Sequence, residues 1–491
     1  MNSSAPRRLR AVAGGKARTA SLFDRARALT RLGRNEDAKL AYLELLAQSP
    51  EHFGALNNLG ALLHDMGYRA AAATAYARAV ACHPKNPVGH VNLANALREA
   101  GELARAREHC EKALALAPDH AAAHQALAGL LAEFGEEEAA EHHRRLGFGK
   151  QQIITLPYHG SGTPISLLLL VSAVGGNIPI RHLLDSQIFR ISVIYADYWN
   201  EDVALPPHDL VFNTIGDADL CHSALAAAAR LLERDSAPVL NPPATVSRSR
   251  RTENAIRLAR LPGVRTGRTV NLPRTTLRGP RAAEALCEAG LGFPLLLRTP
   301  GFHTGRHFLR VESAGELADA VTALPGKELT AIEYLDARGA DGNARKYRVM
   351  FVNGEILPLH LAVSGDWKVH YFTADMADHA GHRAEEQKFL SDMPRAIGAR
   401  AMAGLAHIRD ALGLDYAGID FGLNAAGEIL LFEANATMVV IAPNPDPRWD
   451  YRRAAIARIE MAVRAMLKEK AASRPPLARN RFASIESAAA R

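Results

Sequence analysis

The sequence predicts a multi-domain protein in which an all-α superhelix of repeated helix pairs precedes a region of α/β and α+β structure. Residue types recur every 34 positions up to residue 148, apolar runs then alternate with alanine-rich stretches, and a compact turn near residue 426 joins two apolar runs. The expected parts are a disordered basic tail (1–19), the repeats (20–148), an α/β domain (160–245), a small subdomain (246–330), a large subdomain (331–468) and a flexible tail (469–491).

Composition and charge narrow the class of partner. The 491 residues are 48% hydrophobic and 23% charged, as in an ordinary soluble protein. The net charge of +7 comes from the two ends, since residues 1–20 hold five Arg or Lys and no acid, and residues 468–491 hold six with two acids. The slightly acidic middle argues against nucleic acid as a partner. Four cysteines without a C-x-x-C pattern, and no apolar run of membrane length, favour a reduced, cytoplasmic protein without a membrane partner.

The N-terminal repeat contains three full units and a partial fourth. Three residue types keep the 34-residue period: Gly33, Gly67, Gly101 and Gly135; Ala38, Ala72, Ala106 and Ala140; Pro50, Pro84 and Pro118. Each unit is expected to form two amphipathic helices, with the glycine in the turn between them and the proline after the second. The second unit resembles the tetratricopeptide consensus at Leu59, Gly60, Leu63, Ala72, Tyr76, Ala79 and Pro84.

This resemblance implies a concave surface that binds a protein or peptide partner. A role as a spacer or a dimerisation element is the alternative. The candidates for recognition lie on first helices, and they are His90, Asn92, Asn95, His124 and Gln125.

The remaining chain begins with an α/β pattern. Strands are expected over 167–171, 191–195 and 210–212, with a helix over 223–233. A glycine turn at 174–177 follows the first strand. No G-x-G-x-x-G or G-x-x-x-x-G-K-[ST] motif is present, so Rossmann and P-loop nucleotide binding have no support. Further strands are expected over 293–298, 329–335 and 345–352, and Asn353-Gly354 predicts a tight hairpin turn.

A second hairpin carries the most specific chemical signal. Asp420 and Glu433 flank the turn 424–428, and pairing of 424 with 429 and of 422 with 431 would set 420 opposite 433. Their Cβ atoms would lie about 5 Å apart, with Asn435 on the same face as Glu433. Facing carboxylates repel unless a cation neutralises them, and Mg²⁺ (or Mn²⁺) prefers such oxygen ligands. The spacing therefore predicts a metal–phosphate site, with an incidental acidic pair as the alternative.

Taken in order, the elements over roughly 165–465 resemble the ATP-grasp superfamily. The D-x12-E-x-N spacing is similar to that of D-alanine–D-alanine ligases, while Arg348 before a valine-rich strand resembles ribosomal-protein glutamyl ligases. The domain as a whole also resembles that of glutathione synthase. The resemblance implies ATP as the cofactor and assigns roles to several residues. They are a phosphate-covering loop (Gly301, His303, Thr304, Gly305), basic phosphate contacts (Arg298, and Arg250 or Arg251), an adenine hinge (Glu333, Tyr334, Leu335), a ribose contact (Asp336 or Asp341), a phosphate-transfer residue (Arg348) and Mg²⁺ ligands (Asp420, Glu433, Asn435).

Two departures from the family bear on activity and substrate. Arginine stands where the family usually has two phosphate-contacting lysines, and the two side chains are not equivalent. Gly418 occupies the position of an arginine in D-alanine ligases, so that substrate does not carry over. In the segment 359–371, Lys368 and the two histidines His360 and His370 are candidates for orienting an acidic substrate or an acyl phosphate, unless this is only a solvated loop.

The predicted function is an ATP- and Mg²⁺-dependent ligase that joins a carboxylate to an amine or thiol through an acyl phosphate. The acid would be a small molecule or a peptide, and the repeats would bind that peptide or a protein partner. A kinase on the same fold, or a non-catalytic nucleotide-binding scaffold, is the alternative.

Overall fold

The computed structural model describes residues 19–149, 153–180, 183–200, 203–301, 305, 307–369, 374–440, 443 and 446–473. The chain divides into two compact units, Met1–Gln151 and Gln152–Arg491. Each unit is considered by itself below. Within the described residues, no helix is both long enough and apolar enough to cross a membrane.

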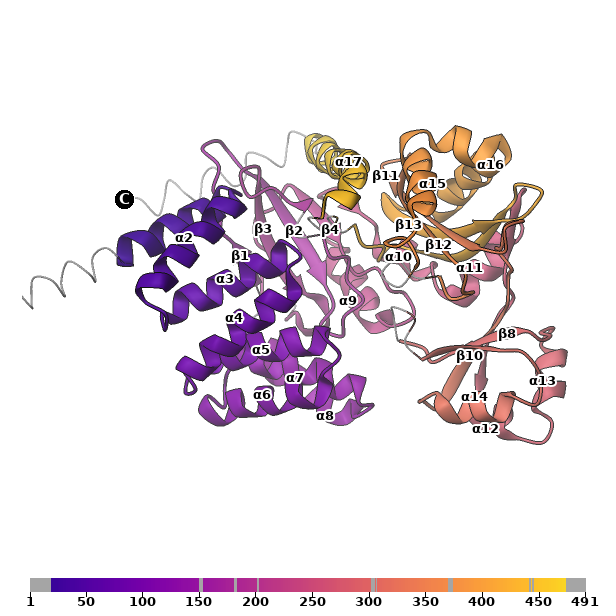
Figure 1. Cartoon of the computed structure of the whole chain (residues 1–491), viewed down its shortest axis with the longest axis horizontal. Helices are drawn as coiled ribbons and strands as arrows, with labels where there is room; N and C mark the ends of the chain where they lie inside the picture. The colour runs from indigo at the N-terminus through magenta and orange to yellow at the C-terminus, as the bar shows by residue number, and fades with distance from the viewer. Residues whose placement is uncertain are drawn as a thin grey trace, which may run out of the picture. The chain divides into compact units, whose positions relative to one another are not determined.

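The first unit is a series of antiparallel helix pairs (Figure 1). After a helix over 19–31 come α2 (Asn35–Gln48), α3 (Phe53–Asp65), α4 (Arg69–Cys82), α5 (Pro87–Glu99), α6 (Leu103–Leu116), α7 (Ala121–Glu133) and α8 (Glu137–Phe148). The four glycines of the 34-residue period have φ between 70° and 86° and form the turns between paired helices, as predicted. At Gly60 the paired helices approach so closely that a Cβ atom would lie 2.6 Å from the Tyr76 ring.

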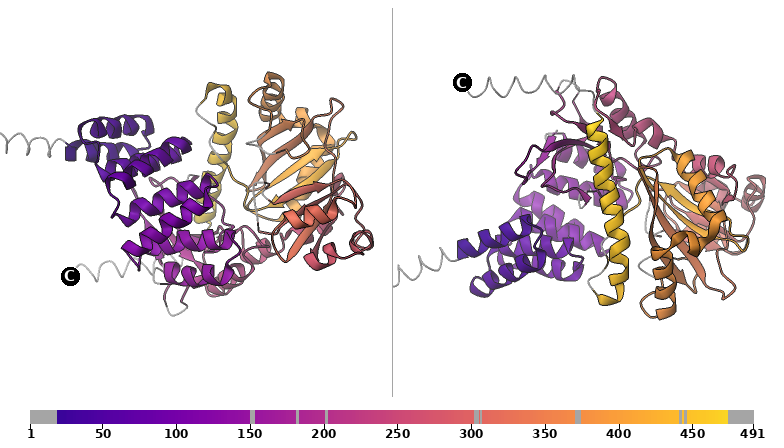
Figure 2. Two further views of the ribbon diagram at one scale, coloured as in Figure 1. Left: turned by 60° about the horizontal axis from the view of Figure 1, so that its bottom comes forward. Right: turned by 90° about the horizontal axis from the view of Figure 1, so that it is seen from above.

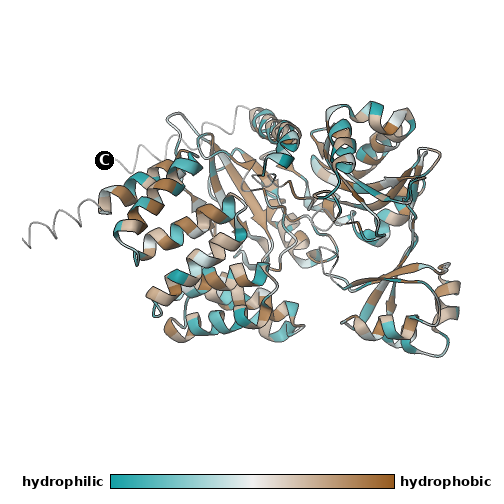
Figure 3. Cartoon of the chain, in the orientation of Figure 1, coloured by the Kyte–Doolittle hydropathy of each residue, from teal (hydrophilic) through white to brown (hydrophobic). Residues whose placement is uncertain are grey.

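The second unit begins with a mostly parallel sheet in the order β1-β3-β2-β4-β5. Its strands are β1 (Ile153–Leu156), β2 (Ile165–Val171), β3 (Phe189–Tyr195), β4 (Leu210–Asn213) and β5 (Val239–Leu240). β2 pairs in parallel with β3 and β4, and α9 (His222–Leu232) follows β4. The apolar strands of this sheet are brown in Figure 3, and their burial confirms the α/β pattern expected from the sequence.

A second, antiparallel sheet has the order β7-β10-β8-β9. Its strands are β7 (Thr269–Pro273), β8 (Leu295–Arg298), β9 (Phe308–Val311) and β10 (Glu328–Glu333), and the helices α12 (Arg274–Arg278), α13 (Ala282–Glu288) and α14 (Leu317–Ala323) belong to the same layer (Figure 1). The expected strand 329–335 ends earlier, at Glu333. Residues 334 and 335 therefore lie in the connection to the third sheet.

The third sheet has the order β12-β11-β13-β14-β6. Its strands are β6 (Val264–Thr266), β11 (Ala344–Val352), β12 (Glu355–Ser364), β13 (Tyr416–Leu423) and β14 (Ile429–Asn435). Asn353 and Gly354 both have positive φ and close the β11–β12 hairpin, as predicted. The helices are α10 (Pro243–Ser247), α11 (Arg251–Leu258), α15 (Ala380–Ser391), α16 (Met393–Leu412) and α17 (Arg453–Ala472).

α17 connects the first and third sheets. It packs against β11 and β12 of the third sheet and against β4 of the first, and Figure 2 shows it as one uninterrupted helix. Side chains of both sheets form one continuous apolar core. The loops that follow β2 and β4 are thereby held close to the ends of β13 and β14, where the candidate site lies.

Candidate functional site

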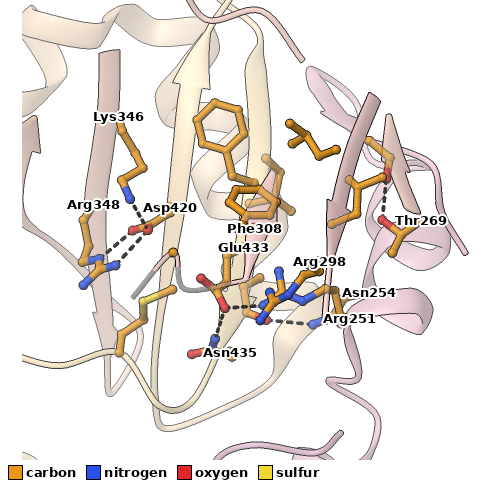
Figure 4. A pocket seen from close by; sticks show the side chains of 18 of the residues that line it. Arg251, Asn254, Thr269, Arg298, Phe308, Lys346, Arg348, Asp420, Glu433 and Asn435 are labelled. Atoms are coloured by element: carbon orange, nitrogen blue, oxygen red, sulfur yellow. Dashed lines mark hydrogen bonds and ion pairs between the residues drawn. The ribbon is translucent and has the colours of Figure 1, made fainter. Parts of the chain in front are cut away.

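A cavity of about 570 Å³ lies where elements of all three sheets of the second unit meet. The first sheet contributes the loops after β2 and β4, the second contributes β8 and β10, and the third contributes β11, β13 and β14. Figure 4 shows basic and acidic side chains pointing toward one another in this space. Of the predicted site residues, those that line the cavity are Arg251, Arg298, Gly305, Glu333, Tyr334, Leu335, Arg348, His360, Lys368, Asp420, Glu433 and Asn435.

Asp420 lies at the centre of a row that crosses three strands. Its Cα partners are Arg348 on β11 and Glu433 on β14. Arg348 grips the carboxylate with both arms of its guanidinium group, with Nε 2.5 Å from Oδ1 and Nη2 2.8 Å from Oδ2. Lys346, two residues earlier on the same strand, brings Nζ to 3.2 Å from Oδ2. Burial alone would raise the pKa of Asp420, but Arg348 and Lys346 outweigh it and hold that pKa far below its usual range.

Glu433 has a different set of partners. Arg251 Nη2 lies 2.6 Å from its Oε1, and Asn435 Nδ2 donates to the same oxygen at 3.0 Å. Burial opposes ionisation of Glu433, yet the attraction of Arg251 lowers its pKa despite repulsion from Asp420. The two carboxylates are thus both ionised and each is neutralised by an arginine from another element.

The predicted pairing of Asp420 with Glu433 is confirmed, but the register proposed nearer the turn was wrong. Residue 422 pairs with 430 rather than 431, and 423 pairs with 429, because a β-bulge follows the Asp420–Glu433 pair. Phe432 is the extra residue in β14. Its ring packs beside Leu335 and also lines the cavity, so the bulge supplies an apolar wall next to the acidic pair.

Arg251 and Arg298 come from different elements and lie near each other in the cavity (Figure 4). Arg251 is the first residue of α11, and Arg298 is the last residue of β8. Arg250, the alternative to Arg251, turns instead to His222, with Nη2 2.7 Å from Nδ1. Burial, and then the nearby charge of Arg251, lower the pKa of Arg298 to about 10. Two partly buried guanidinium groups that repel each other favour an anion between them.

The predicted hinge lies along one wall of the cavity. The backbone of Glu333 is fixed by its N–H donating to Arg268 O at 2.8 Å, and its carboxylate is held 2.9 Å from Arg265 Nη2. Gly267 has to be a glycine here, because a Cβ atom would lie 2.7 Å from Glu333 O. The Arg310 guanidinium lies over the Tyr334 ring, 4.2 Å from the ring centroid, in a cation–π contact. These contacts together fix the position of the hinge backbone along the cavity wall.

Lys368 and Trp367 come from the segment after β12 and contact the second sheet. Lys368 Nζ donates to Phe308 O at 3.3 Å, and the Trp367 ring meets the Phe308 ring edge-on at 5.6 Å. Gly305 lies against Lys368, whose Cε would be 2.8 Å from a Cβ atom at position 305. His303, Thr304 and His370 lie outside the described residues, so their predicted roles stay predictions.

Two predicted residues lie away from the cavity wall. Gly301 is exposed with φ of 80°. Asp341 precedes β11 and pairs with Arg345, with oxygens 2.8 and 3.0 Å from its Nη1 and Nη2. The other ribose candidate, Asp336, pairs with Arg338 at the surface. A ribose contact from either aspartate stays a prediction.

Sequence reasoning missed several residues that shape the site. Asn254 on α11 donates to Ala434 O at 3.0 Å and so fixes β14 behind Glu433. His360, by contrast, was a candidate from the sequence; it is the β12 partner of Arg348 and lies buried on the cavity wall, where burial holds its pKa well below the usual value. No local pattern in the sequence reveals that Asn254 points inward or that a bulge occurs at Phe432.

The two carboxylates have the donor chemistry that Mg²⁺ takes, namely oxygens on adjacent strands beside an amide. Asn435 Oδ1 accepts from Thr437 N and Oγ1, both at 2.9 Å, so its amide has to turn to bring that oxygen to a metal. Among the described residues, no group of three or more His, Cys, Asp or Glu side chains converges as a metal site. Asp420 and Glu433 therefore fit a divalent cation that shares its remaining positions with water and substrate.

Comparison with known proteins identifies the repeats. Residues 87–120 match the tetratricopeptide repeat family. Similar solved structures include a MamA RS-1 double mutant (24% identity, 26% of this chain, 72% of that chain, TM-score 0.25) and MamA from Desulfovibrio magneticus RS-1 (25%, 26%, 71%, 0.24). Another is a tetratricopeptide repeat protein from Parabacteroides merdae (21%, 26%, 51%, 0.25). No curated protein matches the chain. The first unit thus carries tetratricopeptide repeats, which suggest interaction with a protein partner, and a mixed α/β region with several sheets follows it.

Proposed function

We propose that the second unit is an ATP-grasp-type ligase that uses ATP and Mg²⁺ to join a carboxylate to an amine or thiol. The observation that carries this proposal is the row of Arg348, Asp420 and Glu433 across three strands, with Arg251 and Arg298 beside it. The tetratricopeptide repeats would bind the protein or peptide that presents one substrate, or a partner that delivers it.

Charge at the centre of the cavity supports a polyphosphate ligand. Six cationic side chains line the cavity together with five carboxylates, and they are Arg251, Arg298, Arg345, Lys346, Arg348 and Lys368 against Asp217, Asp219, Glu333, Asp420 and Glu433. The cations nearest Asp420 and Glu433 are Arg251, Lys346 and Arg348, and in this partly buried space they can hold a highly charged anion once a metal ion takes over the two carboxylates. Arginine offers paired N–H groups that match phosphate oxygens. A nucleotide triphosphate with a divalent cation would balance the cations and use the carboxylates as metal ligands.

The remaining wall supports a flat, apolar group beside that anion. Leu296, Ile332 and Phe432 line the cavity next to the backbone of the hinge, 333–335. Apolar side chains with a few polar backbone groups are typical of small-molecule and cofactor sites. An adenine ring between Phe432 and the hinge would place the phosphates toward Arg298 and Arg348.

The proposed reaction has two steps. A carboxylate oxygen of the substrate attacks the γ-phosphorus of ATP, ADP leaves, and an acyl phosphate forms. The amine nitrogen or thiol sulfur then attacks the acyl carbon, inorganic phosphate leaves, and the nucleophile loses a proton. A bound Mg²⁺ would neutralise phosphate charge, and the arginines would orient the transferring group, so the protein contributes position and electrostatics rather than a covalent nucleophile.

The first test is nucleotide binding, measured by calorimetry with a non-hydrolysable ATP analogue and Mg²⁺. Arg251→Met removes a charged hydrogen-bond donor worth about 1.5–3 kcal/mol, so we expect Kd to rise about tenfold to hundredfold. Arg250→Met is the matched control, because that neighbouring side chain turns to His222, and its Kd should stay within twofold. Equal effects of the two changes would contradict the placement of the phosphates.

The second test is phosphate release from ATP with a panel of acids and amines. Asp420→Asn and Glu433→Gln should each abolish release, and release unaffected by both would rule out the metal assignment. A phosphorylated substrate without free phosphate would identify a kinase instead. Tight binding of the analogue without turnover across the panel would identify a non-catalytic nucleotide-binding scaffold.

A further inference from the structure

Two histidine pairs occur at equivalent positions of successive repeats in the first unit. His90 on α5 and His109 on α6 bring their Nδ1 atoms to 2.9 Å. His124 on α7 and His143 on α8, each 34 residues further along, bring theirs to 2.8 Å. Each pair joins the first and second helices of one repeat. The same geometry in two repeats indicates a built arrangement rather than a chance contact.

Backbone carbonyls fix the tautomer of the first histidine in each pair. His90 Nε2 lies 3.0 Å from Pro84 O, and His124 Nε2 lies 2.8 Å from Pro118 O. A carbonyl oxygen only accepts, so each Nε2 carries the proton and each Nδ1 presents a lone pair to its partner ring. Donation of the distal N–H to a backbone carbonyl is also how metal-binding histidines are usually oriented.

The partner ring of each pair lies nearer the surface than the first ring. Burial, followed by the charge of His90, lowers the pKa of His109, and burial followed by His124 lowers that of His143. Both partner rings are half-exposed, whereas His90 and His124 are buried. The proton on Nδ1 of the outer ring can therefore move to Nε2 of the same ring. The Nδ1 atoms of both rings then each have a lone pair directed toward the space between the rings.

The nitrogen–nitrogen distances are those of a hydrogen bond between two imidazole rings, and they also suit one coordination geometry without movement of the rings. Metal–imidazole bonds are about 2.0–2.1 Å long, so two nitrogens at right angles on one metal lie about 2.8–3.0 Å apart. Tetrahedral bonds of the same length would separate them by about 3.3–3.4 Å. The observed 2.9 and 2.8 Å match the right-angled arrangement. Square-planar and tetragonal sites with nitrogen ligands are typical of Cu²⁺ and Ni²⁺.

We propose that each pair, His90 with His109 and His124 with His143, is a two-histidine binding site for Cu²⁺ or Ni²⁺. Water fills the remaining positions, since within the described residues no third His, Cys, Asp or Glu joins either pair. Near the first pair the charged neighbours are Arg105, Glu108 and Lys112, and His142 lies beside the second. A bound ion bridges the two helices of a repeat and so stabilises the array independently of the second unit.

Calorimetric titration of the full chain with Cu²⁺ or Ni²⁺ at pH 7.5 tests this proposal. We expect two equivalents to bind, with one lost in His109→Gln, one lost in His143→Gln and both lost in the double variant. His64→Gln is the control, because that exposed ring pairs with Glu99 across repeats, and it should keep both equivalents.

Circular dichroism checks that each variant keeps its helices, and the electron paramagnetic resonance spectrum of bound Cu²⁺ gives a second reading. Two coupled imidazole nitrogens per ion are expected, with the signal lost in the double variant. The proposal is overturned if the double variant binds the same number of ions with an affinity within threefold of the native chain. It is equally overturned if the native chain takes up no ion, which would leave the pairs as hydrogen bonds only.

Discussion

Asp420→Asn should destabilise the second unit, in addition to its expected effect on the proposed activity. The substitution removes the charge that neutralises Arg348 and Lys346 at the centre of the third sheet. Breaking a buried ion pair from one side costs about 3–5 kcal/mol. The side chains of Arg348 and Lys346 keep 20% and 15% of their surface exposed, so we expect the lower end, a loss of about 3 kcal/mol in the free energy of unfolding.

Tryptophan fluorescence during urea denaturation isolates this effect. All three tryptophans (Trp199, Trp367 and Trp449) belong to the second unit. The fluorescence change therefore reports unfolding of the second unit and not of the repeats. Arg348→Met should cost a similar amount. The double variant should lose clearly less than the sum of the two, because Arg348 and Asp420 are then removed together and only Lys346 loses its ion-pair partner.

A change below about 0.5 kcal/mol for Asp420→Asn, or full additivity with Arg348→Met, would refute this account of the row. The urea denaturation curve also gives the conditions under which phosphate release by Asp420→Asn can be interpreted. Loss of phosphate release in Asp420→Asn supports a metal role only at a urea concentration and temperature where fluorescence shows the variant folded. Glu433→Gln, whose ion pair lies nearer the cavity, gives the second reading.

Two further predictions concern stability. Gly60→Ala should cost the repeats about 1–3 kcal/mol by overpacking, since the new methyl group meets the Tyr76 ring, and the thermal transition followed by far-ultraviolet circular dichroism should move while the tryptophan transition stays in place. Arg452→Met should destabilise the second unit by about 3 kcal/mol, because it leaves the fully buried Glu386 without its ion pair, whereas the adjacent Arg453→Met removes only an exposed pair and should cost less than about 1 kcal/mol in the same urea experiment.

Local patterns were the predictable part of this fold. Each repeat is a helix pair with a glycine turn, so its structure depends on residues that are close together in the sequence. The Asn353-Gly354 hairpin is local in the same sense. The opposition of Asp420 and Glu433 was also predictable, because only 12 residues separate them. The bulge at Phe432 was not, since it depends on how the apolar residues of β14 pack against Leu335 and its neighbours.

Contacts over long sequence distances were beyond reach of the sequence alone. Arg251 and Glu433 lie 182 positions apart, and their ion pair forms only because α11 packs against β14. For the same reason the sequence left Arg250 and Arg251 as equal candidates. The first residue of α11 faces the cavity, and the residue before it turns away to His222.

This arrangement changes how the acidic pair should be understood. The sequence argument held that two facing carboxylates need a metal, but Arg348, Lys346 and Arg251 already neutralise them. Under the proposed function, a divalent cation has to take Asp420 and Glu433 from these side chains, which is costly unless the freed cations gain another anion. The phosphates of a nucleotide are such an anion. Exchange of partners would then couple the binding of nucleotide and cation, and an isolated divalent ion would gain little from two carboxylates that are already paired with arginine and lysine.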